Sequence, residues 1–348
     1  MKTKPLGRTG IDVTDYCLGT MTWGTQTPEA DAHHQMDAAL AAGITFVDTA
    51  EMYPVNPISA ETIGLTETII GNWHAKNPGR RGDYILATKH SGEGLGYVRD
   101  GAPISSKTIA ETVEGSLARL QTDYIDLYQF HWPNRGSFQF RKNWDYDPTG
   151  IRGDDLRADV EDCLGALQRE VEKGTIRAFG LSNESAWGTA QFLRVSEEKG
   201  LPRVASVQNE YSLLCRMYDT DMAEMSVAED VGLLAFSPLA CGFLTGKYQD
   251  GAVPPGSRMA IGPKMGGRMS PRVMEATKAY IDIAQAHAID PTHMALAFCA
   301  QRPFIGSVIF GATTQMQLDH IIEGLDVTLS DDIMAAINEA HRAFPMPY

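Results

Sequence analysis

Short apolar runs alternate regularly with longer segments of helical spacing, and this alternation constrains the fold more than any other feature. The eight apolar runs lie at residues 16–20, 45–47, 84–89, 124–131, 176–181, 204–208, 233–236 and 307–310. Helices are expected over residues 29–42, 61–73, 105–120, 155–173, 185–199, 219–230, 271–286, 292–301 and 315–323. Strict alternation of strand and helix is typical of a parallel sheet with helical crossovers. Eight units favour a closed (β/α)8 TIM barrel, and an open doubly wound sheet is the alternative.

The sequence predicts four further features besides this α/β pattern. Gly7 and Gly10 supply turn chemistry for a β-hairpin over residues 4–15. Two loops are unusually long, residues 133–154 after strand four and residues 249–270 after strand seven, which indicates a lid or a pocket wall. Residues 330–343 predict an extra C-terminal helix. No gap interrupts the pattern, so residues 1–348 are expected to form a single domain.

Charge and cysteine usage exclude several classes of partner. The net charge of −14 argues against nucleic acid or an anionic membrane as the main partner. No apolar run reaches the length of a transmembrane helix, and the first residues show no secretory signal. The five cysteines are scattered without a C-x-x-C pair, which predicts reduced thiols in the cytoplasm and no structural metal site. The sequence contains no coiled-coil pattern that would indicate an oligomer.

The stretch from Ile44 to Tyr53 suggests a ligand site. An apolar, β-rich run leads directly into Asp48, and Tyr53 follows five residues later. In a parallel barrel the carboxyl ends of the strands face the ligand. Taken alone, Asp48 could equally cap a turn and Tyr53 could be a half-buried surface aromatic.

Two later strand ends carry further polar side chains. Lys89 ends one apolar strand and His131 ends the next. Separately, Lys89 could be a surface lysine and His131 a structural histidine. No H-x-x-x-H or H-E-x-x-H pattern accompanies His131, so no metal site is expected there.

Together these four residues predict acid catalysis at one barrel rim. An ammonium beside a phenol stabilises phenolate and lowers the phenol pKa from its usual value near 10. A carboxylate would orient that ammonium, and an imidazole N–H could polarise a carbonyl group. This set of Asp48, Tyr53, Lys89 and His131 suits protonation of an oxygen while hydride reaches the adjacent carbon.

Several short motifs, in order along nearly the whole chain, resemble the aldo-keto reductase superfamily of NAD(P)H-dependent (β/α)8 barrels. The similarity is greatest to the bacterial Tas-type branch, which is related to potassium-channel β subunits. The matching stretches are Leu18–Met21, Asp48–Tyr53, Thr88–Lys89, His131–Pro133, Gly180–Asn183, Gln208–Leu214, Phe236–Ala240 and Gly311–Thr313.

The resemblance implies a role for each matching residue. Tyr53 would be the general acid, tuned by Lys89 and Asp48, and His131 would orient the carbonyl. The implied cofactor-binding residues are Thr20, Met21, Asp48, Ser182, Asn183, Gln208, Phe236, Ser237, Pro238, Leu239, Ala240, Gly242, Lys247, Arg258, Gly311, Thr313 and Gln317.

Within this set, Ser182, Asn183 and Gln208 would bind the nicotinamide carboxamide, which suits their hydrogen-bonding groups. A helix cap is the alternative for the Ser-Asn pair. Phe236 would stack on the nicotinamide ring.

The chain departs from the family pattern where adenosine would bind. Many members have arginine at the position of Gln317, and Glu and Asn at the positions of His320 and Ile321. NADPH is nevertheless expected, because Lys247 and Arg258 add local positive charge in an acidic protein. NADH is the alternative cofactor.

The expected function is reduction of aldehydes or ketones to alcohols, with Trp23, Met52 and Trp132 lining an apolar pocket for a small carbonyl substrate. Two alternatives remain. One is a cofactor-binding redox sensor or interaction subunit with little turnover, against which His131 argues because channel β subunits lack histidine there. The other is a Schiff-base lyase that uses Lys89.

Overall fold

The computed structural model describes residues 1–348 and contains a closed barrel of eight parallel strands. The strands follow the order β10-β3-β4-β5-β6-β7-β8-β9 around the barrel. Their bounds are β3 Tyr16–Gly19, β4 Phe46–Asp48, β5 Ile85–His90, β6 Ile125–Phe130, β7 Ile176–Ser182, β8 Val204–Glu210, β9 Gly232–Phe236 and β10 Ile305–Phe310. The predicted (β/α)8 barrel is therefore confirmed.

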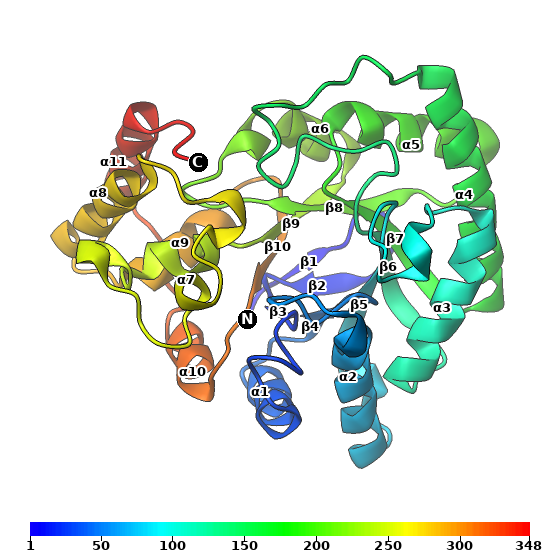
Figure 1. Cartoon of the computed structure of the whole chain (residues 1–348), viewed down its shortest axis with the longest axis horizontal. Coiled ribbons are helices and arrows are strands. Elements are labelled where there is room, and N and C mark those ends of the chain that lie inside the picture. Colours follow the sequence, from blue (N-terminus) through cyan, green and yellow to red (C-terminus); the bar gives the residue numbers. More distant parts are fainter.

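A ring of helices surrounds this barrel in Figure 1. The helices that follow the strands are α1 Glu29–Ala41, α2 Leu65–Lys76, α3 Ser106–Leu120, α4 Gly153–Lys173, α5 Ala186–Lys199, α6 Asp221–Glu229, α9 Pro291–Ala300 and α10 Gln315–Glu323. Apolar side chains on the outer faces of the strands, such as Leu18, Val47 and Tyr128, join the main core beneath these helices. No helix is both long and apolar enough to cross a membrane.

The predicted hairpin is formed by β1 Thr3–Pro5 and β2 Asp12–Thr14, which pair antiparallel. Its apolar side chains Leu6, Ile11 and Val13 pack against Cys17 and Phe46 in a small second core within the barrel. Because hairpin side chains pack into this inner core, the mouth at the other end of the strands is left for ligands.

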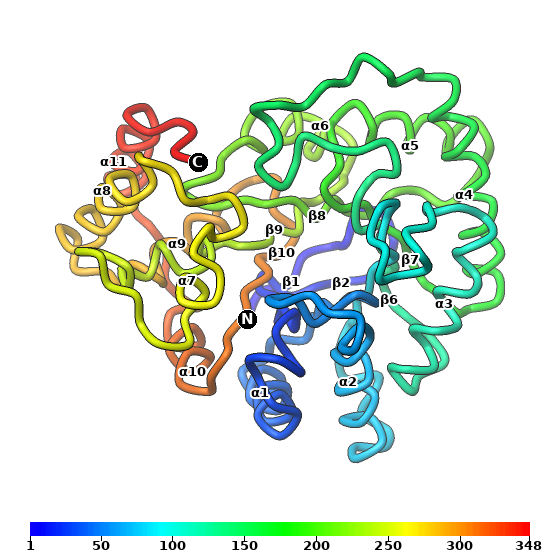
Figure 2. The backbone as a smooth tube through the Cα atoms, viewed as in Figure 1, coloured from blue at the N-terminus to red at the C-terminus, as the bar shows by residue number.

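The predicted C-terminal helix is α11 Asp331–Ala343, and it packs against α8 Val273–Ala286. α8 precedes α9 in the connection from β9 to β10 and contacts it. Like α11, α8 is therefore additional to the eight helices of the ring. Both helices lie at one side of the molecule in Figure 2.

Both expected long loops are present, after β6 and after β9, and the second contains the short helix α7 Arg258–Ile261. Glu210 at the end of β8 ties them together. Its carboxylate accepts hydrogen bonds of 2.7 Å from Arg141 of the first loop and from Arg268 of the second. The hydroxyl of Tyr348 donates to the same carboxylate at 3.1 Å, so the C-terminal residue joins this contact.

Candidate active site

Asp48 and Lys89 form a buried ion pair at the ends of neighbouring strands. Asp48 is the last residue of β4, and Lys89 lies near the end of β5. The Lys89 ammonium donates to Asp48 Oδ2 at 2.5 Å and to the Thr49 carbonyl at 2.8 Å. Strand alternation explains the geometry, because Phe46 and Ala87, two residues earlier on each strand, point into the inner core.

Tyr53 completes a short polar chain. The Lys89 Nζ atom also lies 3.3 Å from the Tyr53 hydroxyl and 4.8 Å from the centre of its ring. The phenol packs in a small apolar cluster with Ala50, Met52 and Val98. The structure thus brings together the carboxylate, ammonium and phenol that the sequence predicted as neighbours.

His131 directly follows β6 and lies beside Tyr53. The two ring centres are 5.7 Å apart in an edge-to-face arrangement. The Nδ1 atom of His131 is buried and has no hydrogen-bond partner in the chain. The backbone N–H of His131 donates to the His90 carbonyl at 2.9 Å, which fixes the start of the following loop.

Burial and the neighbouring charges set the protonation of these groups. Burial raises the pKa of Tyr53 and outweighs the opposing effect of Lys89. Burial disfavours the Lys89 ammonium, but Asp48 and Tyr53 more than offset this, so the Lys89 pKa is raised. Burial and the Lys89 charge hold the pKa of His131 well below its usual value. At neutral pH the site therefore presents a protonated phenol, an ammonium and a neutral imidazole.

This outcome corrects the expectation that Lys89 brings the Tyr53 pKa below its ordinary value. The ammonium acts in the expected direction, but loss of water around the phenol has the larger effect. Lys89 thus limits the rise of the Tyr53 pKa.

Gln129 is a site residue that the sequence analysis missed. Its side-chain amide donates to Asp48 Oδ1 at 3.1 Å, and Gln208 donates to the same oxygen at 2.8 Å. Gln208 also donates to the Gln129 side-chain oxygen at 3.0 Å. The strand pattern contains a signal for Gln129, because it lies two residues after the inward-facing Leu127.

The predicted carboxamide-binding residues lie together at the ends of β7 and β8. The Ser182 hydroxyl donates to the Gln208 carbonyl at 2.8 Å, and the Asn183 amide donates to the His131 carbonyl at 2.9 Å. Oδ1 of Asn183 is buried without a partner. An amide N–H of a nicotinamide group would satisfy this oxygen, so these residues fit such a cofactor.

The segment after β9 is a tight turn of residues with positive φ angles. Ala240, Cys241 and Gly242 have positive φ angles of 48°, 57° and 95°. The backbone N–H groups of Ala240 and Gly242 donate to the Ser237 and Leu239 carbonyls at 2.8 and 2.9 Å, so hydrogen bonds within the turn hold its shape. A Cβ atom on Gly242 would lie 2.6 Å from Cε and 2.8 Å from Nζ of Lys247, so glycine leaves room for this lysine.

The remaining predicted phosphate-side residues surround this segment. Burial and the nearby charge of Arg258 both lower the pKa of Lys247, which places the two cations in one electrostatic environment. Phe236 and Ser237 are half-buried at the end of β9, followed by Pro238 and Leu239. An anion between Lys247 and Arg258 would relieve their mutual repulsion.

The predicted adenosine-side residues follow β10. Gly311 is exposed, and the backbone N–H and hydroxyl of Thr313 donate to Gln317 Oε1 at 2.9 and 3.1 Å. Ile321 is buried and offers no polar contact. After the neighbouring strand β3, the Thr20 hydroxyl donates to the Asp48 carbonyl at 2.9 Å, and the Met21 carbonyl accepts from the Val55 backbone N–H at 2.9 Å.

Trp23 does not match its predicted role as a pocket wall. Its side chain is only 1% exposed within the main core, and its indole N–H donates to Gln35 of α1 at 3.0 Å. Trp23 follows β3 in sequence, but the chain turns it towards α1 and leaves it no free surface. Met52 and Trp132 do pack around Tyr53, in the small apolar cluster.

A cavity of about 410 Å³ lies beneath the first long loop, between that loop, α4 and the outer faces of β6 and β7. Trp132 and Ser182 border it, whereas Tyr53, Lys89 and His131 do not. Its apolar lining includes Phe130, Leu181 and Phe192. This cavity is therefore separate from the reacting groups.

Fold and site define a class of protein, an oxidoreductase that uses a nicotinamide cofactor and acts on carbonyl groups. The comparisons with known proteins give the same class. The Aldo/keto reductase family matches residues 16–342, and the chain belongs to this family.

Three relatives place the chain more closely. Protein tas of Escherichia coli is 42% identical over 353 aligned positions, which cover 100% of this chain and 99% of that protein. Uncharacterized oxidoreductase YrpG of Bacillus subtilis is 33% identical and covers 98% and 95%. A probable voltage-gated potassium channel subunit beta of Arabidopsis thaliana is 28% identical and covers 94% and 92%. The predicted Tas-type branch and its relation to channel β subunits are confirmed.

Proposed function

We propose that the protein reduces aldehydes or ketones to alcohols with NADPH and that Tyr53 is the general acid. The observation that carries this proposal is the position of the Lys89 ammonium, 2.5 Å from Asp48 and 3.3 Å from the Tyr53 hydroxyl. The neutral imidazole of His131 lies beside the same phenol.

Each side chain has a defined part in this reaction. Bound NADPH supplies the hydride that the carbonyl carbon accepts. His131 donates an N–H to the carbonyl oxygen and polarises the C=O bond. Tyr53 gives its proton to that oxygen, which completes the alcohol and leaves a phenolate. Lys89 stabilises this phenolate, Asp48 holds Lys89, and solvent returns the proton to Tyr53.

The preference for NADPH rests on Lys247 and Arg258. Their shared electrostatic environment supports binding of a phosphate group in a chain whose net charge is −14. Arg258 would pair with the 2′-phosphate, and Lys247 with the pyrophosphate. Gln317 is neutral, so selectivity against NADH depends on Arg258.

The substrate is a small carbonyl compound with an apolar body. Met52 and Trp132 support this, because they form the apolar surroundings of Tyr53. Aromatic and medium-length aliphatic aldehydes and ketones suit such a surface.

Two features of the whole chain fit this proposal. The barrel, hairpin and outer helices support a single catalytic domain over residues 1–348, because α8 and α11 pack onto the ring and form no separate core. All five cysteines are free thiols, which supports a reducing compartment such as the cytoplasm.

Substitution of Tyr53 by Phe tests the assignment. Tyr53→Phe should lower turnover by about 10²-fold or more, because it removes only the hydroxyl that supplies the proton. The Kd for NADPH, measured by fluorescence titration, should remain unchanged. Tyr97→Phe is a matched control, since Tyr97 is 60% exposed on the loop after β5. Retained turnover in Tyr53→Phe would contradict the proposal.

A cofactor-binding sensor or interaction subunit is the second candidate, supported by the relative named as a potassium channel subunit beta. Tight NADPH binding without turnover across a broad carbonyl panel would favour it. A Schiff-base lyase is disfavoured, because Lys89 already hydrogen-bonds to Asp48, Thr49 and Tyr53 and its raised pKa keeps the amine protonated.

A further inference from the structure

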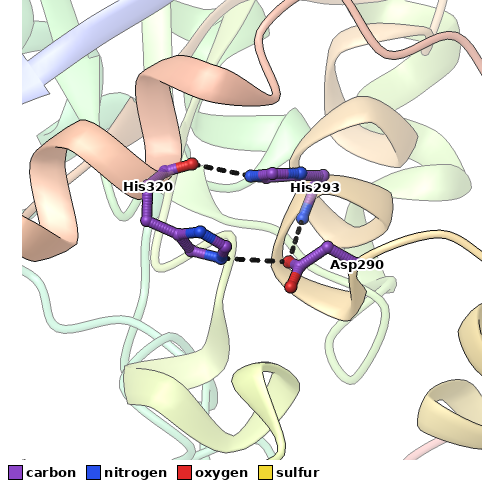
Figure 3. Close-up of side chains that lie close together, drawn as sticks. All are labelled: Asp290, His293 and His320. Carbon is purple, nitrogen blue, oxygen red and sulfur yellow. Dashed lines mark hydrogen bonds and ion pairs between the residues drawn. The ribbon is translucent and has the colours of Figure 1, made fainter.

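Three potential metal ligands lie close together between α9 and α10 (Figure 3), outside the set of residues assigned to carbonyl reduction. Asp290 precedes α9, His293 lies in its first turn, and His320 lies in the last turn of α10. One ring nitrogen of each histidine and one Asp290 oxygen lie within 4.8 Å of one another. Imidazole nitrogen and carboxylate oxygen are common ligands of Zn²⁺.

A backbone contact orients His293. Its Nε2 atom lies 2.6 Å from the His320 carbonyl oxygen, as the dashed line in Figure 3 shows. A carbonyl only accepts, so Nε2 carries the proton and Nδ1 keeps its lone pair for a metal. Gly324 permits this orientation, because a Cβ atom there would clash with the His293 ring.

His320 has carboxylates near both ring nitrogens. Nε2 lies 3.3 Å from Asp290 Oδ1, and Nδ1 lies 3.7 Å from Glu323 Oε2. A carboxylate near the second nitrogen of a metal-binding histidine fixes its tautomer and raises its basicity. His293 therefore has a hydrogen-bond acceptor at the nitrogen that a metal would leave free, and His320 has a carboxylate 3.7 Å from its own free nitrogen.

The position of Asp290 is fixed as well. Its Oδ1 atom accepts from the backbone N–H groups of Thr292 and His293 at 2.8 and 3.2 Å, as the N-cap of α9. The same oxygen lies 3.3 Å from His320 Nε2 (Figure 3), so it is the carboxylate atom that faces the histidines. The Asp290 and Glu323 carboxylates also supply negative charge for a divalent ion.

We propose that Asp290, His293 and His320 bind Zn²⁺ and that water completes its coordination. Bonds of about 2.1 Å in a tetrahedral site place ligands about 3.4 Å apart, so small side-chain rotations must close the cluster around the ion. No spacing in the sequence predicts this site, because 27 positions separate the two histidines. The site lies on the same helix as the adenosine-side residue Gln317, and a bound ion would join α9 to α10.

Zinc binding to the untagged, chelator-dialysed protein tests the proposal. Titration calorimetry measures the binding, and the midpoint of thermal unfolding measures its effect on stability. One Zn²⁺ should bind per chain and raise the unfolding temperature, whereas Mg²⁺ should do neither because it prefers oxygen ligands. Asp290→Asn and His320→Ala should each weaken Zn²⁺ binding about 10-fold or more. Asparagine keeps the N-cap, so Asp290→Asn preserves the start of α9.

His34→Ala is the matched control, because His34 is an exposed histidine on α1 outside the cluster. Its affinity for Zn²⁺ should equal that of the wild type. Absence of saturable binding, or equal binding by wild type, Asp290→Asn and His320→Ala, would overturn the proposal. So would a Co²⁺ spectrum with thiolate charge-transfer bands, since it would place the metal at a cysteine.

Discussion

The Gln129 side-chain amide donates a hydrogen bond of 3.1 Å to Oδ1 of Asp48, the carboxylate that holds Lys89 through its other oxygen. Both residues are fully or almost fully buried. Gln129 and Gln208 thus satisfy one side of the carboxylate while Lys89 satisfies the other. A carboxylate held on both sides keeps the ammonium aimed at Tyr53.

Gln129→Leu should therefore lower kcat for carbonyl reduction about tenfold, with a small change in KM. The lost hydrogen bond frees Asp48 to rotate, and one hydrogen bond to a charged group contributes about 1.5–3 kcal/mol. Steady-state kinetics over a range of pH measures the effect. A purely structural role would lower the unfolding temperature and leave the kinetic constants of the folded enzyme unchanged. Partial recovery in Gln129→Asn would support positioning by the amide.

The pH dependence of turnover should report the Tyr53 and His131 environments. The raised pKa of Tyr53 keeps the phenol protonated up to about pH 10, so kcat for reduction should stay level through neutral pH and fall only above that value. The depressed pKa of His131 predicts no loss near pH 6.5. A reduction rate that halves near pH 6.5 in wild type would contradict the neutral imidazole.

Removal of Lys89 should weaken this acid. Lys89→Met should lower kcat by about 10²-fold or more and raise the Tyr53 pKa further, because the phenolate loses its stabilising charge. The measurement is the pH profile of alcohol oxidation, in which phenolate acts as the base, and its rising limb should move to higher pH. Since Lys89→Met leaves Asp48 unpaired, the Asp48→Asn/Lys89→Met variant separates catalysis from folding. An unmoved limb in both variants would exclude this role.

Arg258 should decide between the two nicotinamide cofactors. Arg258→Ala should raise the Kd for NADPH about tenfold, as loss of a charge-assisted hydrogen bond predicts, and leave the Kd for NADH unchanged. Lys264→Ala is the control, because Lys264 is an exposed cation in the same loop. Fluorescence titration of wild type, Arg258→Ala and Lys264→Ala with each cofactor measures all six constants. Equal affinity of wild type for the two cofactors would mean that Arg258 does not read the 2′-phosphate.

Local sequence pattern sufficed to predict the barrel, because the strands are short apolar runs and some helices end at a glycine, such as Gly174 and Gly200. Ser105 is the N-cap of α3 and forms a capping box with Thr108. The expected helix over residues 61–73 begins later, at Leu65, because Gly64 adopts a positive φ of 81° after a short 3-10 turn. Helix ends of this kind depend on backbone geometry that composition leaves open.

Contacts between distant residues were the part that could not be predicted. Glu210 pairs with Arg141 and Arg268, and no local pattern indicates which arginines it meets. Trp23 was expected to line the apolar pocket, whereas the structure turns it onto Gln35. The same limit hid Gln129, whose partner Asp48 lies 81 positions earlier.

His90 should make the fold sensitive to mild acid. This last residue of β5 is fully buried, and burial together with the charge of Arg99 lowers its pKa to about 3. In the unfolded chain the His90 pKa returns to about 6.5. Below that value the unfolded state therefore binds a proton that the folded state does not bind until about pH 3.

Because the folded-state pKa is depressed, the His90 contribution to the free energy of unfolding is fully present above about pH 6.5 and decreases as the pH falls towards about 3. One such group changes the free energy of unfolding by up to about 1.4 kcal/mol per pH unit. His90→Gln should therefore show a shallower loss of stability between about pH 6 and pH 5 than wild type, in urea unfolding followed by circular dichroism. His34→Gln, at an exposed position, should keep the wild-type slope. Equal slopes in wild type and His90→Gln would show that His90 does not carry this acid sensitivity.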